Sequence, residues 1–219
     1  MAVDAVVFDL DGVLLDSEQV WDRARRDLVA ESGGRWTAEA STAMLGMSAP
    51  EWSRYVAEEL RVPLPPTEID REVVRRVIQA YRERLPVLPG AREAVERLGA
   101  RWPLGLATSS NREVVDVVLE ALGVADRFVA TVSSEEVGRG KPAPDVYLEA
   151  ARRMGVDPAA AVAIEDSSNG LRSAAAAGMS IIAIPNPHFR PAPDALQLAD
   201  VVLADLGELT PAVVENAAR

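Results

Sequence analysis

The chain contains no cysteine, one histidine (His188) and one lysine (Lys141). Without cysteine there is no disulfide, no thiolate nucleophile and no metal site built on sulfur. A single histidine leaves too little material for a Ser-His-Asp triad or a multi-histidine metal centre, and we assign His188 no catalytic role. All the other basic side chains are arginines, so the place that kept a lysine is expected to need a compact point charge.

Long apolar runs and an excess of positive charge are also missing. No stretch approaches the ~20 apolar residues of a membrane span, and the first residues carry no basic segment of the kind that begins a signal peptide. The chain has 23 basic and 34 acidic residues and a net charge of −11, which disfavours nucleic acids and anionic membranes as partners. We therefore expect a cytoplasmic protein, monomeric, with no membrane or nucleic-acid partner.

Short apolar runs alternate with helical patterns along most of the 219 residues. This alternation predicts an α/β fold, a Rossmann-like doubly wound parallel sheet with helices on both faces. The apolar runs are 3–8, 104–108, 128–132, 161–164, 181–184 and 201–203, and the helical patterns are about 90–100, 111–122, 144–155 and 168–177.

The alternation breaks once, after the first strand. Between residues 16 and 87 the pattern favours helices alone, at about 17–32, 37–45, 49–60 and 67–85. Ser48 and Glu51 have the spacing of a capping box, which marks a helix start. We expect a helical-bundle cap domain over 16–87, inserted into a core domain made of 1–15 and 88–219 and placed above the ligand end of the sheet.

Paired acids follow the first strand. Asp9 and Asp11 are two apart in an extended segment, so both carboxylates face the same cleft, and Gly12 allows a tight turn after them. The alternatives are a surface turn and a calcium loop. An EF-hand loop would continue with oxygen ligands, whereas this segment continues with the apolar residues 13–15, so the calcium alternative fails.

A second acidic pair, Glu165 and Asp166, follows the fourth apolar run. Because the carboxyl ends of parallel strands meet at one edge of a sheet, these acids are expected beside Asp9 and Asp11. Four carboxylates would repel one another unless a cation joined them, and hard oxygen ligands suit Mg²⁺.

Two hydroxyl groups and the lone lysine are also expected at the edge of the sheet where the carboxyl ends of the strands meet. Thr108 and Ser109 end the second run, and Lys141 lies on the restricted backbone between a glycine and a proline. Hydroxyls, a helix N-terminus and a lysine form a cradle for a phosphoryl group. For the next two residues, Ser110 and Asn111, we favour the simpler interpretation that one of them caps the following helix.

Four motifs, in order, resemble those of the haloacid dehalogenase (HAD) superfamily. They occupy residues 8–14, 106–109, 140–145 and 164–170 and together cover essentially the whole chain. The helical insert resembles the C1 cap of the β-phosphoglucomutase-like branch. The resemblance implies Asp9 as nucleophile and Asp11 as general acid and then base, with a phosphate cradle of Thr108, Ser109 and Lys141. It also implies Mg²⁺ as cofactor, held by Asp9, Asp11, Glu165 and Asp166.

The motif residues also bear on the kind of reaction. A halide leaving group needs no proton, so Asp11 favours phosphate chemistry over dehalogenation. The related phosphoglucomutases carry a histidine and an arginine where this chain has Trp21 and Ala49. Other cap arginines could compensate, namely Arg23, Arg25 and Arg54. Residues 14–23 and 88–94 look instead like the 2-deoxyglucose-6-phosphate and hexitol-phosphate phosphatases of this branch.

The sequence thus predicts a Mg²⁺-dependent phosphatase that hydrolyses small phosphorylated metabolites, sugar or sugar-alcohol phosphates, through an aspartyl-phosphate. A sugar phosphomutase is the first alternative. A non-catalytic phosphate-binding protein is the second, although a binder needs no nucleophile and acid together. Candidate substrate residues, with core packing or helix capping as their structural alternatives, are Trp21, Met47, Trp52, Asn111 and Arg112.

Overall fold

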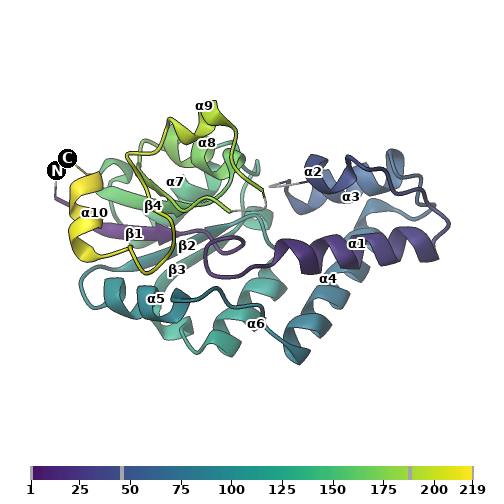
Figure 1. Ribbon diagram of the computed structural model, residues 1–219, viewed down its shortest axis with the longest axis horizontal. Helices are drawn as coiled ribbons and strands as arrows, with labels where there is room; N and C mark the ends of the chain where they lie inside the picture. Colours follow the sequence, from purple (N-terminus) through teal and green to yellow (C-terminus); the bar gives the residue numbers. More distant parts are fainter. Residues whose placement is uncertain (1, 45–46, 187–188, 219) are drawn as a thin grey trace.

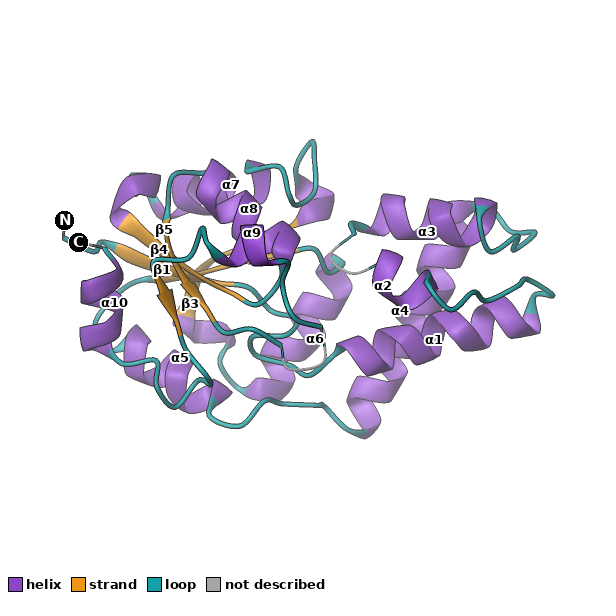
Figure 2. Cartoon of the chain, turned by 45° about the horizontal axis from the view of Figure 1, so that its top comes forward, coloured by secondary structure: helices purple, strands orange, loops and turns teal. Residues whose placement is uncertain are grey.

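The core of the protein is a parallel sheet, drawn in orange in Figure 2. Its strand order is β3-β2-β1-β4-β5-β6. The computed structural model describes residues 2–44, 47–186 and 189–218, so His188 lies outside the described residues. The chain moves outward from β1 in both directions, which is the doubly wound arrangement that the sequence predicts. The strands are β1 Ala5–Phe8, β2 Leu104–Thr108, β3 Phe128–Ser133, β4 Ala161–Glu165, β5 Ser180–Ala183 and β6 Val201–Val202.

Helices cover both faces of this sheet. Alternate residues of β1 serve the two faces: Val6 and Phe8 join one apolar cluster, and Ala5 and Val7 join the other. This is the period of two that a buried strand imposes. One face carries α5 Ala91–Gly99, α6 Arg112–Leu122 and α10 Pro211–Ala217, and the other carries α7 Asp145–Met154, α8 Ser168–Ala176 and α9 Pro193–Leu196.

A group of helices stands to one side of the sheet, past the end of β1 (Figure 1). Helix α4 packs against both α1 and α3, and its apolar stripe is buried between them. The predicted capping box is confirmed, because the Ser48 N–H donates to Oε2 of Glu51 at 2.8 Å. These helices are α1 Glu18–Glu31, α2 Ala40–Ala43, α3 Ala49–Glu58 and α4 Pro66–Glu83.

Several elements differ from the sequence prediction. The helix expected over 37–45 is a single turn, because within residues 37–44 only Ala40 and Met44 are buried, too short an apolar stripe for a longer helix; residue 45 lies outside the described residues. The 3₁₀ turns, α9 and α10 carry no periodic signal and were not predicted. The short 3₁₀ turns among them are η1 Ala125–Arg127, η2 Ser134–Glu136 and η3 Pro158–Ala160.

The chain enters and leaves the helical insert through two adjacent segments. The Asp16 N–H donates to the Pro86 carbonyl at 2.8 Å, and the Leu88 N–H donates to the Leu14 carbonyl at 3.0 Å. Between these two bonds Leu15 pairs with Val87 in an antiparallel bridge. The paired segments hold the insert close to the end of β1, where the acidic motif lies. The domain bounds at 15/16 and 87/88 stay a prediction.

Candidate active site

The motifs at the strand ends meet in one cavity of about 340 Å³. Asp9 lies directly after β1, Thr108 ends β2 and Asp166 follows β4. Lys141 reaches the same place from the loop before α7. Strands β1 and β4 are neighbours in the sheet although they lie far apart in the sequence, with Val6 paired to Val162. The lining residues include Asp9, Asp11, Glu18, Thr42, Thr108, Ser109, Lys141, Asp166, Ser167, Ser168 and Asn169.

Lys141 lies at the centre of the site and is 3% exposed. Its Nζ donates to Oδ1 of Asp9 at 2.7 Å and to Oε1 of Glu165 at 2.6 Å. The Tyr147 hydroxyl donates to the same Glu165 oxygen at 2.7 Å, and the Tyr147 ring lies 4.9 Å from Nζ. Lys141 therefore links the first and fourth motifs through two buried ion pairs.

Three buried carboxylates, Asp9, Glu165 and Asp166, each offer an oxygen, and these oxygens lie within 4.8 Å of one another. Burial raises the pKa of Asp9 to about 8 and raises the pKa of Asp166 well above its usual range. Burial also opposes the charge of Lys141, but Asp9 and Glu165 outweigh it and raise the lysine pKa above its ordinary value. One ammonium group faces three carboxylates, and a divalent cation fits that imbalance and this oxygen set.

The backbone after β1 approaches this acidic cluster closely. Gly12 has φ +80°, and a Cβ built at this position would lie 1.9 Å from Oδ2 of Asp166. Only glycine suits both the conformation and the space, which agrees with the turn expected there. The Asp11 backbone is thereby brought beside the Asp166 carboxylate.

The Ser110 hydroxyl, for which the sequence favours helix capping, instead orients Asp11. Ser110 donates its Oγ hydrogen to Oδ2 of Asp11 at 2.5 Å, while Oδ1 of Asp11 is buried and has no hydrogen-bond partner among the described residues. Thr108 Oγ1 accepts the Ser110 N–H at 3.0 Å; Ser109 lines the cavity, and its buried Oγ has no partner in the described part of the chain. One carboxylate oxygen and one hydroxyl thus remain available for a ligand.

The prediction that the side chain of Ser110 or Asn111 caps the following helix is wrong. Asn111 occupies the N-cap position of α6, but its side chain makes no capping bond. It donates instead to Asp70 on α4, at 3.1 Å, and to Glu135 at 2.9 Å. This amide joins the helical insert to the core, a contact between distant segments that local spacing cannot show.

The remaining substrate candidates separate into two groups. Trp21, Met47 and Trp52 line a smaller cavity of about 60 Å³ that also includes Asp11. Both tryptophans are buried in the apolar cluster as well, so the packing role and the lining role coexist. Asn111 and Arg112 line neither cavity; the Arg112 guanidinium is held by Thr131 and Glu136.

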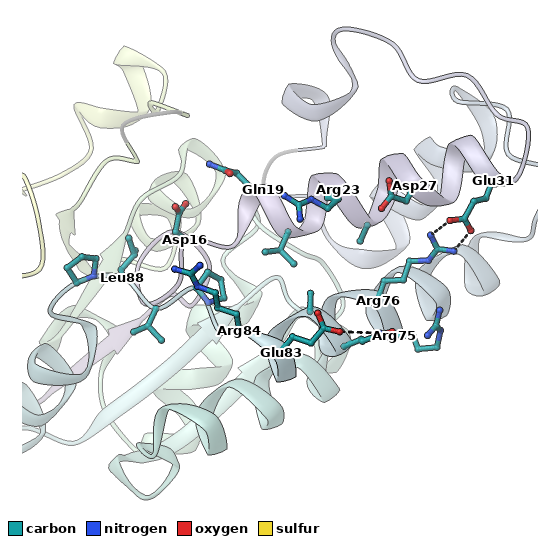
Figure 3. Close-up of a pocket in the computed structure, with 17 residues that line it drawn as sticks. Asp16, Gln19, Arg23, Asp27, Glu31, Arg75, Arg76, Glu83, Arg84 and Leu88 are labelled. Carbon is teal, nitrogen blue, oxygen red and sulfur yellow. Dashed lines mark hydrogen bonds and ion pairs between the residues drawn. The ribbon is translucent and has the colours of Figure 1, made fainter.

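A larger cavity of about 940 Å³ lies elsewhere, along the outer side of α1 and α4 (Figure 3). Its walls carry charges of both signs, and Arg76 holds the Glu31 carboxylate at one end. None of the described motif residues lines this groove, whereas Asp9, Thr108 and Lys141 line the smaller cavity at the strand ends.

Known proteins are similar to this chain in sequence and in fold. Residues 3–178 match the model of the haloacid dehalogenase-like hydrolases. The chain belongs to this family. The predicted family and hydrolase class are confirmed, and the match spans all four motifs. Within the described residues, no helix combines the length and apolarity that a membrane crossing requires.

Individual relatives align over nearly the full chain. Hexitol phosphatase B of Escherichia coli K12 is 38% identical over 210 residues, covering 94% of both chains. The structure of CbbY from Rhodobacter sphaeroides in complex with xylulose-(1,5)bisphosphate has a TM-score of 0.84 at 29% identity, covering 97% of this chain and 99% of that one. β-Phosphoglucomutase of Clostridium difficile, with a TM-score of 0.85 over 99% and 97% of the chains at 22% identity, shares the fold.

Proposed function

We propose that this chain is a Mg²⁺-dependent phosphatase of sugar or sugar-alcohol phosphates that works through an aspartyl-phosphate. The observation that carries the proposal is the arrangement of Asp9, Asp11 and Lys141 in one cavity. Lys141 holds one oxygen of Asp9 and leaves the other oxygen to attack. Asp11 lies on the same side with an unpartnered oxygen. The phosphatase relatives support the reaction class.

In the first step the free Asp9 oxygen attacks phosphorus, and the bond from phosphorus to the leaving oxygen breaks. Asp11 gives its proton to that oxygen, so the alcohol departs neutral. In the second step Asp11 takes a proton from water, whose oxygen attacks the phosphoryl group and releases Asp9 and inorganic phosphate. Thr108, Ser109 and Lys141 hold the non-bridging oxygens throughout.

The acidic cluster is the proposed Mg²⁺ site. Side-chain oxygens of Asp9 and Asp166 and the Asp11 carbonyl would bind the ion, with Glu165 as ligand or as support through Lys141. When bound, the ion supplies positive charge to the phosphoryl oxygens. This role fits the surplus of buried carboxylates over cations. The cytoplasmic location and the monomeric state remain parts of the proposal.

Sugar phosphomutase activity remains the alternative, and the cap residues argue against it. Ala49, at the position of the mutase arginine, is buried at the start of α3 and brings no charge. Incubation with β-glucose 1-phosphate, Mg²⁺ and a trace of the bisphosphate separates the two reactions. We expect release of inorganic phosphate to exceed formation of glucose 6-phosphate; the opposite ratio would restore the mutase.

The direct test measures phosphate release from a panel of sugar phosphates with Mg²⁺ and with chelator. We expect phosphate release in Mg²⁺ and none in chelator. Asp9→Asn is expected to lower kcat by at least ~1000-fold while the fold persists. Asp126→Asn, the same change at an exposed acid far from the motifs, is the matched control. An Asp9→Asn variant with more than a tenth of the wild-type rate contradicts the mechanism.

A further inference from the structure

A buried arginine lies among aromatic rings in the helical insert. Arg25, on α1, is 8% exposed, and its guanidinium carbon lies 5.2 Å from the Trp21 ring centre and 4.8 Å from the Trp52 ring centre. The two indoles meet edge to face, with ring centres 6.2 Å apart. Cation–π contacts of this kind favour a guanidinium and fix its orientation.

Arg25 has a hydrogen-bond donor that no described residue satisfies. Among residues 2–44, 47–186 and 189–218 its Nε is buried without a partner, and Glu18, Asp22 and Asp11 act on the guanidinium through their charges. A buried guanidinium with an unsatisfied donor is destabilising, because ring contacts replace only part of its lost hydration. A donor left free in this way is suited to a ligand that arrives from solution.

The cavity beside Arg25 opens toward the reacting groups. Asp11, Glu18 and Ser109 line both this small cavity and the larger one that contains Asp9. A leaving group that extended from a phosphoryl group on Asp9 past Asp11 would reach the cavity that Arg25 lines.

The charges around Arg25 indicate what kind of leaving group fits. Asp11 and Glu18 also line the cavity, so one cation is already matched by two carboxyl groups. A second anionic group on the substrate would meet the Glu18 carboxylate, whereas a hydroxyl can accept from the guanidinium and donate to Glu18. A neutral alcohol with several hydroxyls suits this mixture of donors and acceptors better than a bisphosphate or a sugar acid.

We propose that Arg25 determines leaving-group specificity, donating hydrogen bonds to hydroxyl oxygens of a neutral polyol while Glu18 accepts from them. This inference rests on the proposed phosphatase function. The indoles of Trp21 and Trp52 position the guanidinium and do not contact the reacting phosphorus.

The test compares two substrates of the same catalytic site. Glucitol 6-phosphate has a polyol as its leaving group, whereas the leaving group of p-nitrophenyl phosphate carries no further hydroxyl. For Arg25→Met we expect kcat/KM to fall ~10- to 100-fold for glucitol 6-phosphate, mainly through KM, as for lost hydrogen bonds to a charged group. With p-nitrophenyl phosphate the kcat/KM of Arg25→Met should differ from that of the wild type by less than about threefold. Arg23→Met, on the same helix but in the outer groove of Figure 3, should leave both substrates unaffected.

Equal losses on both substrates, or an unchanged ratio, would overturn the inference. If Arg25→Met does not fold, Arg25→Lys keeps the charge and loses the planar fork, and the same selective loss is expected. Wild-type protein is also expected to prefer glucitol 6-phosphate over 6-phosphogluconate, its analogue with a terminal carboxylate; the reverse preference overturns the neutral-polyol assignment. Wild-type inactivity on every phosphomonoester would instead refute the proposed phosphatase itself.

Discussion

Replacing Lys141 by methionine tests the electrostatics of the site most sharply. The change removes the ammonium group that lies 2.7 Å from Asp9 and 2.6 Å from Glu165 and leaves both buried carboxylates without it. Two hydrogen bonds to charged groups are worth ~1.5–3 kcal/mol each, and breaking a buried ion pair on one side costs about 3–5 kcal/mol. We therefore expect the free energy of unfolding to fall by about 3–5 kcal/mol.

The assay is urea unfolding at pH 7 in the presence of chelator, together with phosphomonoester turnover in Mg²⁺. The double variant Lys141→Met with Glu165→Gln is the internal control, since removing one orphaned charge should restore part of the stability. Lys141→Arg keeps the charge, but its broader fork does not fit between Asp9, Glu165 and Tyr147, so kcat should fall ~100-fold. A loss of stability below ~1 kcal/mol in Lys141→Met, or near-normal turnover of Lys141→Arg, would refute the reasoning.

Three further predictions follow from neighbouring contacts. Ser110→Ala should lower kcat ~10-fold with little change in KM, because Asp11 loses the hydroxyl that orients it; a rise in KM alone would contradict this role. Mg²⁺ should raise the melting temperature of the wild type and not that of Asp166→Asn, as differential scanning calorimetry can show. Burial raises the pKa of Glu18 from 4.5 to about 7, so the native state binds more protons than the unfolded chain, and stability falls as pH rises through this window. In chelator, Glu18→Gln should make the fall in the free energy of unfolding over this pH range ~1–2 kcal/mol smaller, with solvent screening allowed for. Parallel curves of that free energy against pH for the wild type and the variant would contradict the prediction.

The sequence was sufficient for those parts of the site that a parallel sheet brings together by its topology. Asp9, Thr108 and Asp166 lie near strand ends, and such ends share one edge whatever the helices do. Lys141 stands out in the sequence because it is the only lysine of the chain. These positions depend on strand order and on composition, both of which a single sequence can reveal.

The rest depends on tertiary packing. Tyr147 belongs to the buried face of α7 and looks like an ordinary core residue until Glu165 is placed beside its hydroxyl. Ser110 has the sequence context of a helix cap, and only the fold shows that Asp11 is its acceptor. Arg25 is one of three cap arginines that the sequence offers as a cation, and only the fold shows that it is buried against two tryptophans from different helices.

The most direct test of the central claim is to trap the covalent intermediate on Asp9. Wild-type protein is mixed with substrate and Mg²⁺, quenched in acid within one turnover, and reduced with borohydride, which converts an aspartyl-phosphate to homoserine. Peptide mass spectrometry then locates the modified residue. The account predicts homoserine at position 9, dependent on substrate and absent from Asp9→Asn. Turnover without any modification at this position, or modification of another carboxylate, would contradict it.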